Sequence, residues 1–187
     1  MAWYNNLIKN VFSIGEDLKQ APVVQYYGVG SASPNKDKYE DLAEDGYVKN
    51  AIAYRCVNEI AQGACNVGFK VFSGETEIEE HPLKEILKRP SPLMSGTEYF
   101  SGLYSYLLLS GNTYLLRTGP ENQAPKELHL LRPDRMRIVA GSRSIPTAYE
   151  YVVGGRVIEK YDVDNETGAS DVKHMKMWHP LDDHYGM

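Results

Sequence analysis

The feature that most constrains the fold of this chain is a change in hydrophobic period close to its middle. Before Gly111, apolar residues recur mostly at the spacing of one helical face, and afterwards they fall into short runs separated by turn residues. Helices followed by strands favour an α+β fold over a doubly wound parallel sheet. The sequence therefore predicts N-terminal helices followed by mostly antiparallel strands.

The first predicted helix covers residues 47–66. An apolar side chain returns at every fourth position of this segment, which is the pattern of a helix with one face in the core: Val48, Ile52, Cys56, Ile60 and Ala64. Within this stripe the Cys56 thiol is expected to be a small core group rather than a catalytic nucleophile.

Two further helices are predicted from their end signals. The segment 81–89 opens with His-Pro, and Pro82 suits the first helical position because its missing N–H would be unpaired there anyway. The next helix begins at Ser95-x-x-Glu98, a capping box, and Gly111 is placed to end it.

Strand patterns dominate the second half. "RVIEKY" follows "AYEYVV" across Gly154-Gly155, which can take the positive φ angles of a two-residue hairpin turn. A strand with a turn at Ser73-Gly74 is also expected in "FKVFSG". The remaining expected strands are residues 112–118, 127–131, 135–139 and 174–178.

The chain has 187 residues, enough for one domain with an additional arm. Residues 1–38 are predicted to be an N-terminal arm with a flexible linker, because "GVGSASPNKDK" is small, polar and contains proline. Residues 39–187 are predicted to form the α+β domain.

The net charge of −5 gives no global positive field that would attract nucleic acid or an anionic membrane. Two cysteines nine residues apart indicate free thiols and a reducing compartment.

The C-terminal segment "HMKMWHPLDDHYGM" is the densest cluster of candidate ligands. Its three histidines are five residues apart, a spacing that places them on one face of neither a strand nor a helix: His174, His179 and His184. Polar surface residues after a strand are the favoured interpretation. The alternative is a small metal-dependent hydrolase or nuclease with zinc held by His179, Asp182, Asp183 and His184.

Other possible sites receive less support. Gly28-Val29-Gly30 lacks the third glycine and the strand–helix context of a phosphate loop. The basic residues Arg132, Arg135, Arg137 and Arg143 alternate between faces and suit a solvated strand edge or a salt-bridged surface between subunits. The sequence therefore predicts no catalytic, cofactor-binding or metal-binding residue and no enzyme.

Several motifs, in their order and spacing, resemble the portal proteins of tailed bacteriophages, and more narrowly the large siphophage portal family. They span roughly residues 47–187 and comprise Cys56-Val57, Ile60-Ala61, His81-Pro82-Leu83, Gly111-Asn112-Thr113-Tyr114, Leu128, Leu131 with Pro133, and Tyr185-Gly186-Met187. Asn66-Val67-Gly68 departs from the family, which often has Pro-Leu there. The family pattern continues with Ser-Pro and a long further segment, so a chain truncated at its C-terminus is expected.

The resemblance implies a structural subunit of a ring, typically of twelve copies, at one capsid vertex. It implies a wing-type domain here, with the stem, clip and crown regions largely missing. The implied partners are the same chain, the terminase large subunit, the major capsid or scaffold protein, head–tail connector proteins, and double-stranded DNA passing without sequence-specific binding. No membrane partner is expected. The implied location is the virion, after assembly in the host cytoplasm. Tyr104 and Tyr114 are hypothesised to be subunit contacts, since amphipathic rings suit interfaces.

Overall fold

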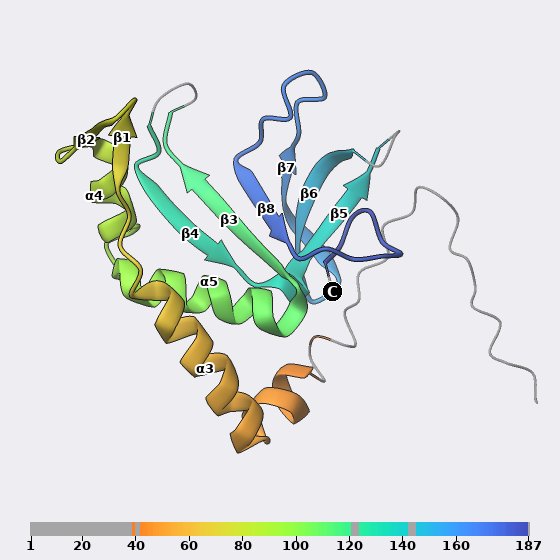
Figure 1. Ribbon diagram of the computed structural model, residues 1–187. Coiled ribbons are helices and arrows are strands. Elements are labelled where there is room, and N and C mark those ends of the chain that lie inside the picture. Colours follow the sequence, from red (N-terminus) through yellow and green to blue (C-terminus); the bar gives the residue numbers. More distant parts are fainter. Residues whose placement is uncertain (1–38, 40–41, 121–123, 142–144, 187) are drawn as a thin grey trace, which may run out of the picture.

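The computed structural model describes residues 39, 42–120, 124–141 and 145–186, so the predicted arm and linker at 1–38 lie outside the described residues. Its helices gather on one side of the strands, which form two small sheets and a separate hairpin (Figure 1). This arrangement confirms the predicted α+β class. Within the described residues, no helix is long and apolar enough to cross a membrane.

The helical part consists of a short π-helix followed by three α-helices. Their bounds are η1 Leu42–Val48, α3 Ala51–Cys65, α4 Pro82–Lys88 and α5 Gly96–Ser110. The predicted end signals are confirmed. The Glu98 amide donates to the Ser95 hydroxyl and the Ser95 amide donates to the Glu98 carboxylate, which completes the capping box of α5. Gly111 ends the same helix with a φ of 69°.

Every strand pairing in the described part of the chain is antiparallel. One sheet has the order β4-β3-β8, a second has the order β5-β6-β7, and β1 pairs only with β2. A 3-10 turn at Pro133–Arg135 joins the first sheet to the second. The strands are β1 Val71–Ser73, β2 Thr76–Ile78, β3 Asn112–Thr118, β4 Glu127–Leu131, β5 Met136–Ala140, β6 Pro146–Val153, β7 Arg156–Asp162 and β8 Val172–Lys176.

The predicted turns lie between the expected strands. Gly74 sits between β1 and β2 with a φ of 63°. Gly154 and Gly155 join β6 to β7 with φ values of 58° and 79°, the left-handed backbone that a two-residue hairpin turn requires. The hairpin is therefore set by local chemistry that is visible in the sequence.

A single cluster of buried side chains joins the two three-stranded sheets. Its members come from β3, β5, β6, β8 and the C-terminal segment: Tyr114, Met136, Ile138, Tyr149, Val172 and Tyr185. The hydroxyl of Tyr185 accepts a hydrogen bond from the Ile138 amide at 3.0 Å, across 47 residues of sequence. The C-terminal segment is thus part of the core and holds a strand of the second sheet.

The predicted core face of α3 is wrong. Ile52 and Ile60 are 77% and 56% exposed, and Cys56 is exposed rather than a core residue. The buried position on this helix is Ala61, which lies on the neighbouring arc that faces α5. The apolar arc of α3 is wider than the contact that α5 makes with it, so a periodic pattern alone could not identify the packed side.

Candidate functional site

The C-terminal segment folds back onto the junction between α5 and β3. Asn112, the first residue of β3, bonds with both backbone groups of Gly186: its Nδ2 donates to the Gly186 carbonyl at 3.2 Å, and its Oδ1 accepts from the Gly186 amide at 2.7 Å. Asn112 Nδ2 also donates to the Ser110 carbonyl at 2.6 Å. One buried amide side chain thereby joins segments 74 residues apart.

The space around Gly186 admits no side chain. A Cβ atom at this position would lie 2.1 Å from the Gly111 carbonyl oxygen and 2.8 Å from the Met177 amide nitrogen. These two backbone groups also bond to each other, at 2.8 Å. The junction is therefore a close approach of three backbone segments, and only glycine fits it.

His174 of β8 completes this junction. Its ring stacks on Tyr114 with centroids 4.3 Å apart and meets the edge of Tyr149. Its Nε2 lies 3.0 Å from Asn112 Oδ1, whose orientation is fixed by the Gly186 and Ser110 backbone partners. Because that oxygen only accepts, His174 donates from Nε2 and is held as the neutral Nε2–H tautomer.

Burial, together with a smaller effect of the positive charge of Lys176, lowers the pKa of His174 to about 4. The unfolded chain therefore binds a proton near pH 6.5 that the folded chain does not bind until about pH 4. We expect the contribution of His174 to the free energy of unfolding to fall by about 3 kcal/mol as the pH drops through this window, and that contribution to level off below it.

This prediction is checked by urea unfolding at pH 7 and pH 4.5. The variant His174→Gln keeps a side-chain donor and does not titrate, so its stability should change less between the two pH values than that of the wild type. The difference between the wild type and the variant in this pH-dependent loss of unfolding free energy isolates the effect of His174 from that of the carboxylates. An equal loss in both proteins would contradict the assignment of His174 as buried and neutral.

Two of the proposed zinc ligands, His179 and Asp182, hold the turn of their own segment. Nδ1 of His179 accepts from the amides of Leu181 and Asp182, and Oδ1 of Asp182 accepts from the amides of His184 and Tyr185. His184 is buried, so the interpretation of all these groups as surface residues is wrong for it. Among the described residues no group of three or more His, Cys, Asp or Glu could hold a metal ion. The geometry gives the hydrolase alternative no support.

The turn held by these bonds presents two large apolar side chains to solvent. Trp178 is 82% exposed and Leu181 is 87% exposed, while the residues on either side of the turn are tied to the core or to β8. Two acids, Asp182 and Asp183, follow directly in the sequence. We call residues 177–183 the C-terminal loop; it is a fixed turn with an apolar tip.

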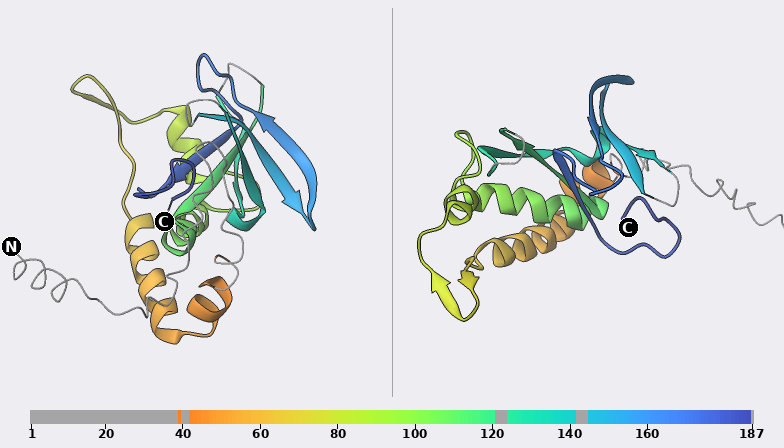
Figure 2. Two further views of the ribbon diagram at one scale, coloured as in Figure 1. Left: turned by 90° about the vertical axis from the view of Figure 1, so that its right-hand side faces the viewer. Right: turned by 90° about the horizontal axis from the view of Figure 1, so that it is seen from above.

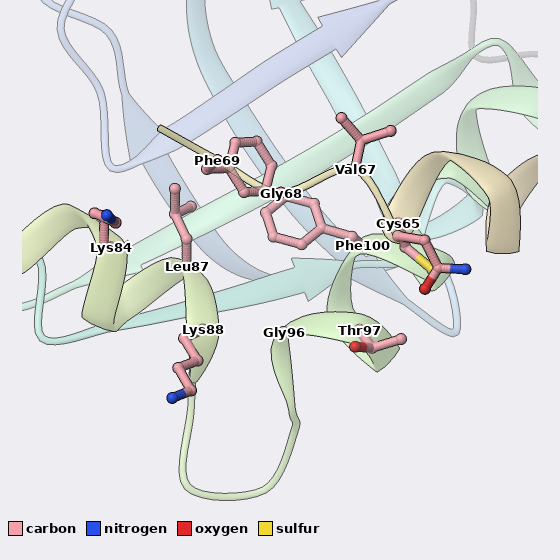
Figure 3. Close-up of a pocket in the computed structure, with 11 residues that line it drawn as sticks. Cys65, Val67, Gly68, Phe69, Lys84, Leu87, Lys88, Gly96, Thr97 and Phe100 are labelled. Atoms are coloured by element: carbon pink, nitrogen blue, oxygen red, sulfur yellow. The ribbon is translucent and has the colours of Figure 1, made fainter. Parts of the chain in front are cut away.

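A hollow lies where the end of α3 meets α4 and the start of α5. Figure 3 shows Leu87 and the rings of Phe69 and Phe100 lining it together, with Lys84 and Lys88 on α4 beside them. The centroids of the two rings are 4.9 Å apart, and the hollow has a volume of about 320 Å³. Among its lining residues there are two lysines and no acid. We call this feature the α3–α5 groove.

The groove depends on a close contact between two helices. A Cβ atom on Gly96, the first residue of α5, would lie 2.4 Å from the carbonyl oxygen of Leu87 and 2.9 Å from that of Lys88. Gly96 thus lets the end of α4 approach the start of α5, which places Leu87 beside the aromatic pair. Neither the aromatic pair nor this glycine was identified from the sequence.

The arginine-rich stretch forms contacts within the chain. Arg132 bonds Asp134 through two nitrogens, Arg137 pairs with Glu150, and Arg135 donates to the Tyr151 hydroxyl at 3.1 Å. Arg143 lies outside the described residues. Arg135 and Arg137 therefore brace the second sheet, and Arg132 braces the turn that leads into it.

Tyr114 is fully buried at 0% exposure, so its hypothesised role as a contact between subunits is wrong. It lies at the centre of the core cluster, against His174 and Tyr149. Tyr104 is half-buried on α5.

Two sequence signals could have indicated the C-terminal loop and the α3–α5 groove. They are "WHPLDD" in the loop and the "VGF" segment after α3, both of which place large apolar residues among turn-forming residues.

Comparison with known families gives a match over most of the chain. The model of the phage portal protein family matches residues 51–187. An uncharacterized protein of Rickettsia bellii is 41% identical over 148 residues, and one of Rickettsia felis is 40% identical over 147 residues. Each alignment covers 76% of this chain and 37% of the relative. The chain thus spans well under half the length of these relatives.

Solved structures give the same result. A chain from the neck of an empty GTA particle, obtained with C6 symmetry, is 35% identical with a TM-score of 0.77; the alignment covers 87% of this chain and 43% of that one. A chain from the virion of a native gene transfer agent particle is 34% identical with a TM-score of 0.72, covering 86% and 41%. A third, from a native GTA neck with C12 symmetry, is 33% identical with a TM-score of 0.70, covering 86% and 40%.

Proposed function

Because the chain belongs to the phage portal protein family, we propose that it acts as a structural subunit of a ring at the capsid vertex of a phage-like particle. The observation that best supports this role is its similarity to chains of particle necks with C6 and C12 symmetry. Residues 39–187 would supply the wing-type domain of each subunit. The number of copies we expect is twelve.

The finer roles belong to the same proposal. The ring would form the channel through which DNA is packaged and ejected, and it would dock the terminase large subunit, the capsid or scaffold protein and the head–tail connector. The net charge of −5 suits a channel that lets DNA slide rather than holding it. Assembly would take place in the host cytoplasm, and the finished ring would reside in the virion.

Packaging is tested in the cell that encodes the chain. Deleting its coding sequence should leave particles without nuclease-protected DNA, and supplying the intact sequence in trans should restore protected DNA. A full yield of DNA-filled particles in the deletion strain would contradict the proposed role in packaging.

A further inference from the structure

The C-terminal loop and the α3–α5 groove lie at opposite ends of the molecule. In Figure 1 the loop projects beside the C-terminus on the right, whereas α4 lies on the left. The view from above in Figure 2 separates them in the same way. A ring built from one kind of chain needs two different surfaces of this kind, one on each side of the subunit.

We propose that the C-terminal loop of one subunit inserts its apolar tip into the α3–α5 groove of the next copy of this chain. This inference rests on the proposed ring, and it names the two surfaces that would close it. The occupant of the groove is thus a second copy of residues 177–183, with Trp178 and Leu181 as the side chains that enter.

The apolar parts of the two surfaces match in character. Trp178 and Leu181 are 82% and 87% exposed on a turn that is held by hydrogen bonds from backbone amides to the side chains of His179 and Asp182, so little conformational freedom is lost when they bind. The groove offers aromatic and aliphatic walls, and one of them, Phe69, is 47% exposed. A rigid tryptophan entering an aromatic pocket is a common centre of binding energy at interfaces.

The charges match as well. The groove is rimmed by Lys84 and Lys88 with no acid among its lining residues, and the loop carries Asp182 and Asp183 next to its apolar tip. Lysines facing carboxylates around an apolar centre favour this contact electrostatically. Lys176, the basic residue nearest the loop, bonds the Asp183 carbonyl and thus stays with its own chain.

A native thiol provides the test. Cys65 lines the groove, whereas Cys56 is exposed on a different face of α3. In a Cys56→Ser background, Leu181→Cys should form a disulfide with Cys65 of the neighbouring copy on mild oxidation, because such a bond requires Cα atoms within about 7 Å. The expected product is a ladder of covalent oligomers on a non-reducing gel, and it should vanish when Cys65 is also changed to serine.

The matched control carries its new thiol elsewhere. Ile158 is 63% exposed on the edge strand β7, and Ile158→Cys in the same background should give no ladder. Equal yields from the two positions, or no ladder from position 181, overturn the proposed contact. A disulfide closed within a single chain also overturns it, since it would show that the groove holds a segment of the same molecule.

Mixing two variants tests the head-to-tail arrangement. A chain with Trp178→Ala and Leu181→Ala keeps its groove, and a chain with Phe69→Asp keeps its loop. Each alone should need about 100-fold more protein for half-maximal assembly than the wild type. Together they should form pairs and nothing larger, because only one competent contact exists per pair.

The failure of this inference differs from the failure of the proposed ring. If the loop variant and the groove variant each formed rings at the same protein concentration as the wild type, the loop–groove contact would be overturned and the portal role would stand. A wild-type protein that forms no ring at any concentration would contradict the portal role itself, and the loop–groove contact with it.

Discussion

Replacing Gly186 with alanine should lower the free energy of unfolding by about 3 kcal/mol, because the added methyl group meets backbone that cannot move aside. The Cβ would lie 2.1 Å from the Gly111 carbonyl oxygen, and relieving that clash would break the bonds between Gly186 and Asn112. Urea unfolding followed by circular dichroism measures the change.

Gly63 supplies the matched control for this substitution. It lies inside α3, and a Cβ there would meet nothing within 4 Å. Gly63→Ala should therefore stabilise the protein by about 0.5–1 kcal/mol through helix propensity alone. Similar effects at both positions would contradict the close approach of the C-terminal segment to the α5–β3 junction.

Replacing Tyr114 with alanine should lower the free energy of unfolding by about 3–5 kcal/mol, because its ring is fully buried between two sheets and its removal would leave a cavity in the core. Burial also raises the pKa of Tyr114 well above that of a free tyrosine, so the residue stays neutral in the core. Thermal unfolding at pH 7 measures the loss.

The comparison residue for Tyr114 is Tyr54, which is 51% exposed on α3. Tyr54→Ala should change stability by no more than about 1 kcal/mol. If the alanine at position 114 left stability unchanged and altered only assembly, Tyr114 would be a surface contact between subunits, contrary to its position in the core.

Local signals in this sequence predicted local structure well. The capping box at Ser95, the glycine after α5 and the Gly154-Gly155 turn each depend on a few neighbouring residues, and each lies where expected. Strands β3 and β4 have the bounds predicted from their apolar runs. Propensity and turn chemistry act within a few residues of sequence, so a single chain is enough to identify them.

Long-range features were not predictable in this way. The apolar stripe of α3 indicates which arc of the helix avoids water, but not which arc another element covers, so Cys56 and Ile60 were placed in the wrong environment. The bonds between Asn112 and Gly186 span 74 residues. Their residue types also suit an ordinary turn, and only the sheet pairing of β3 with β8 brings them together.

The family motifs proved more informative than the site chemistry. Gly111-Asn112-Thr113-Tyr114 and Tyr185-Gly186 were recognised as separate elements of a resemblance, and the structure joins them in one junction with His174. Two of the residues that suggested zinc, His179 and Asp182, instead fix a turn. A cluster of ligand-type residues in sequence is therefore weak evidence for a metal site without geometry.

Native mass spectrometry of the purified protein, at a series of concentrations, tests the central claim most directly. We expect a closed ring of about twelve identical subunits without bound metal, because a head-to-tail contact between copies closes only at a fixed number. A monomer or dimer that carries one zinc ion per chain would contradict the portal role, and would return attention to His179, Asp182, Asp183 and His184.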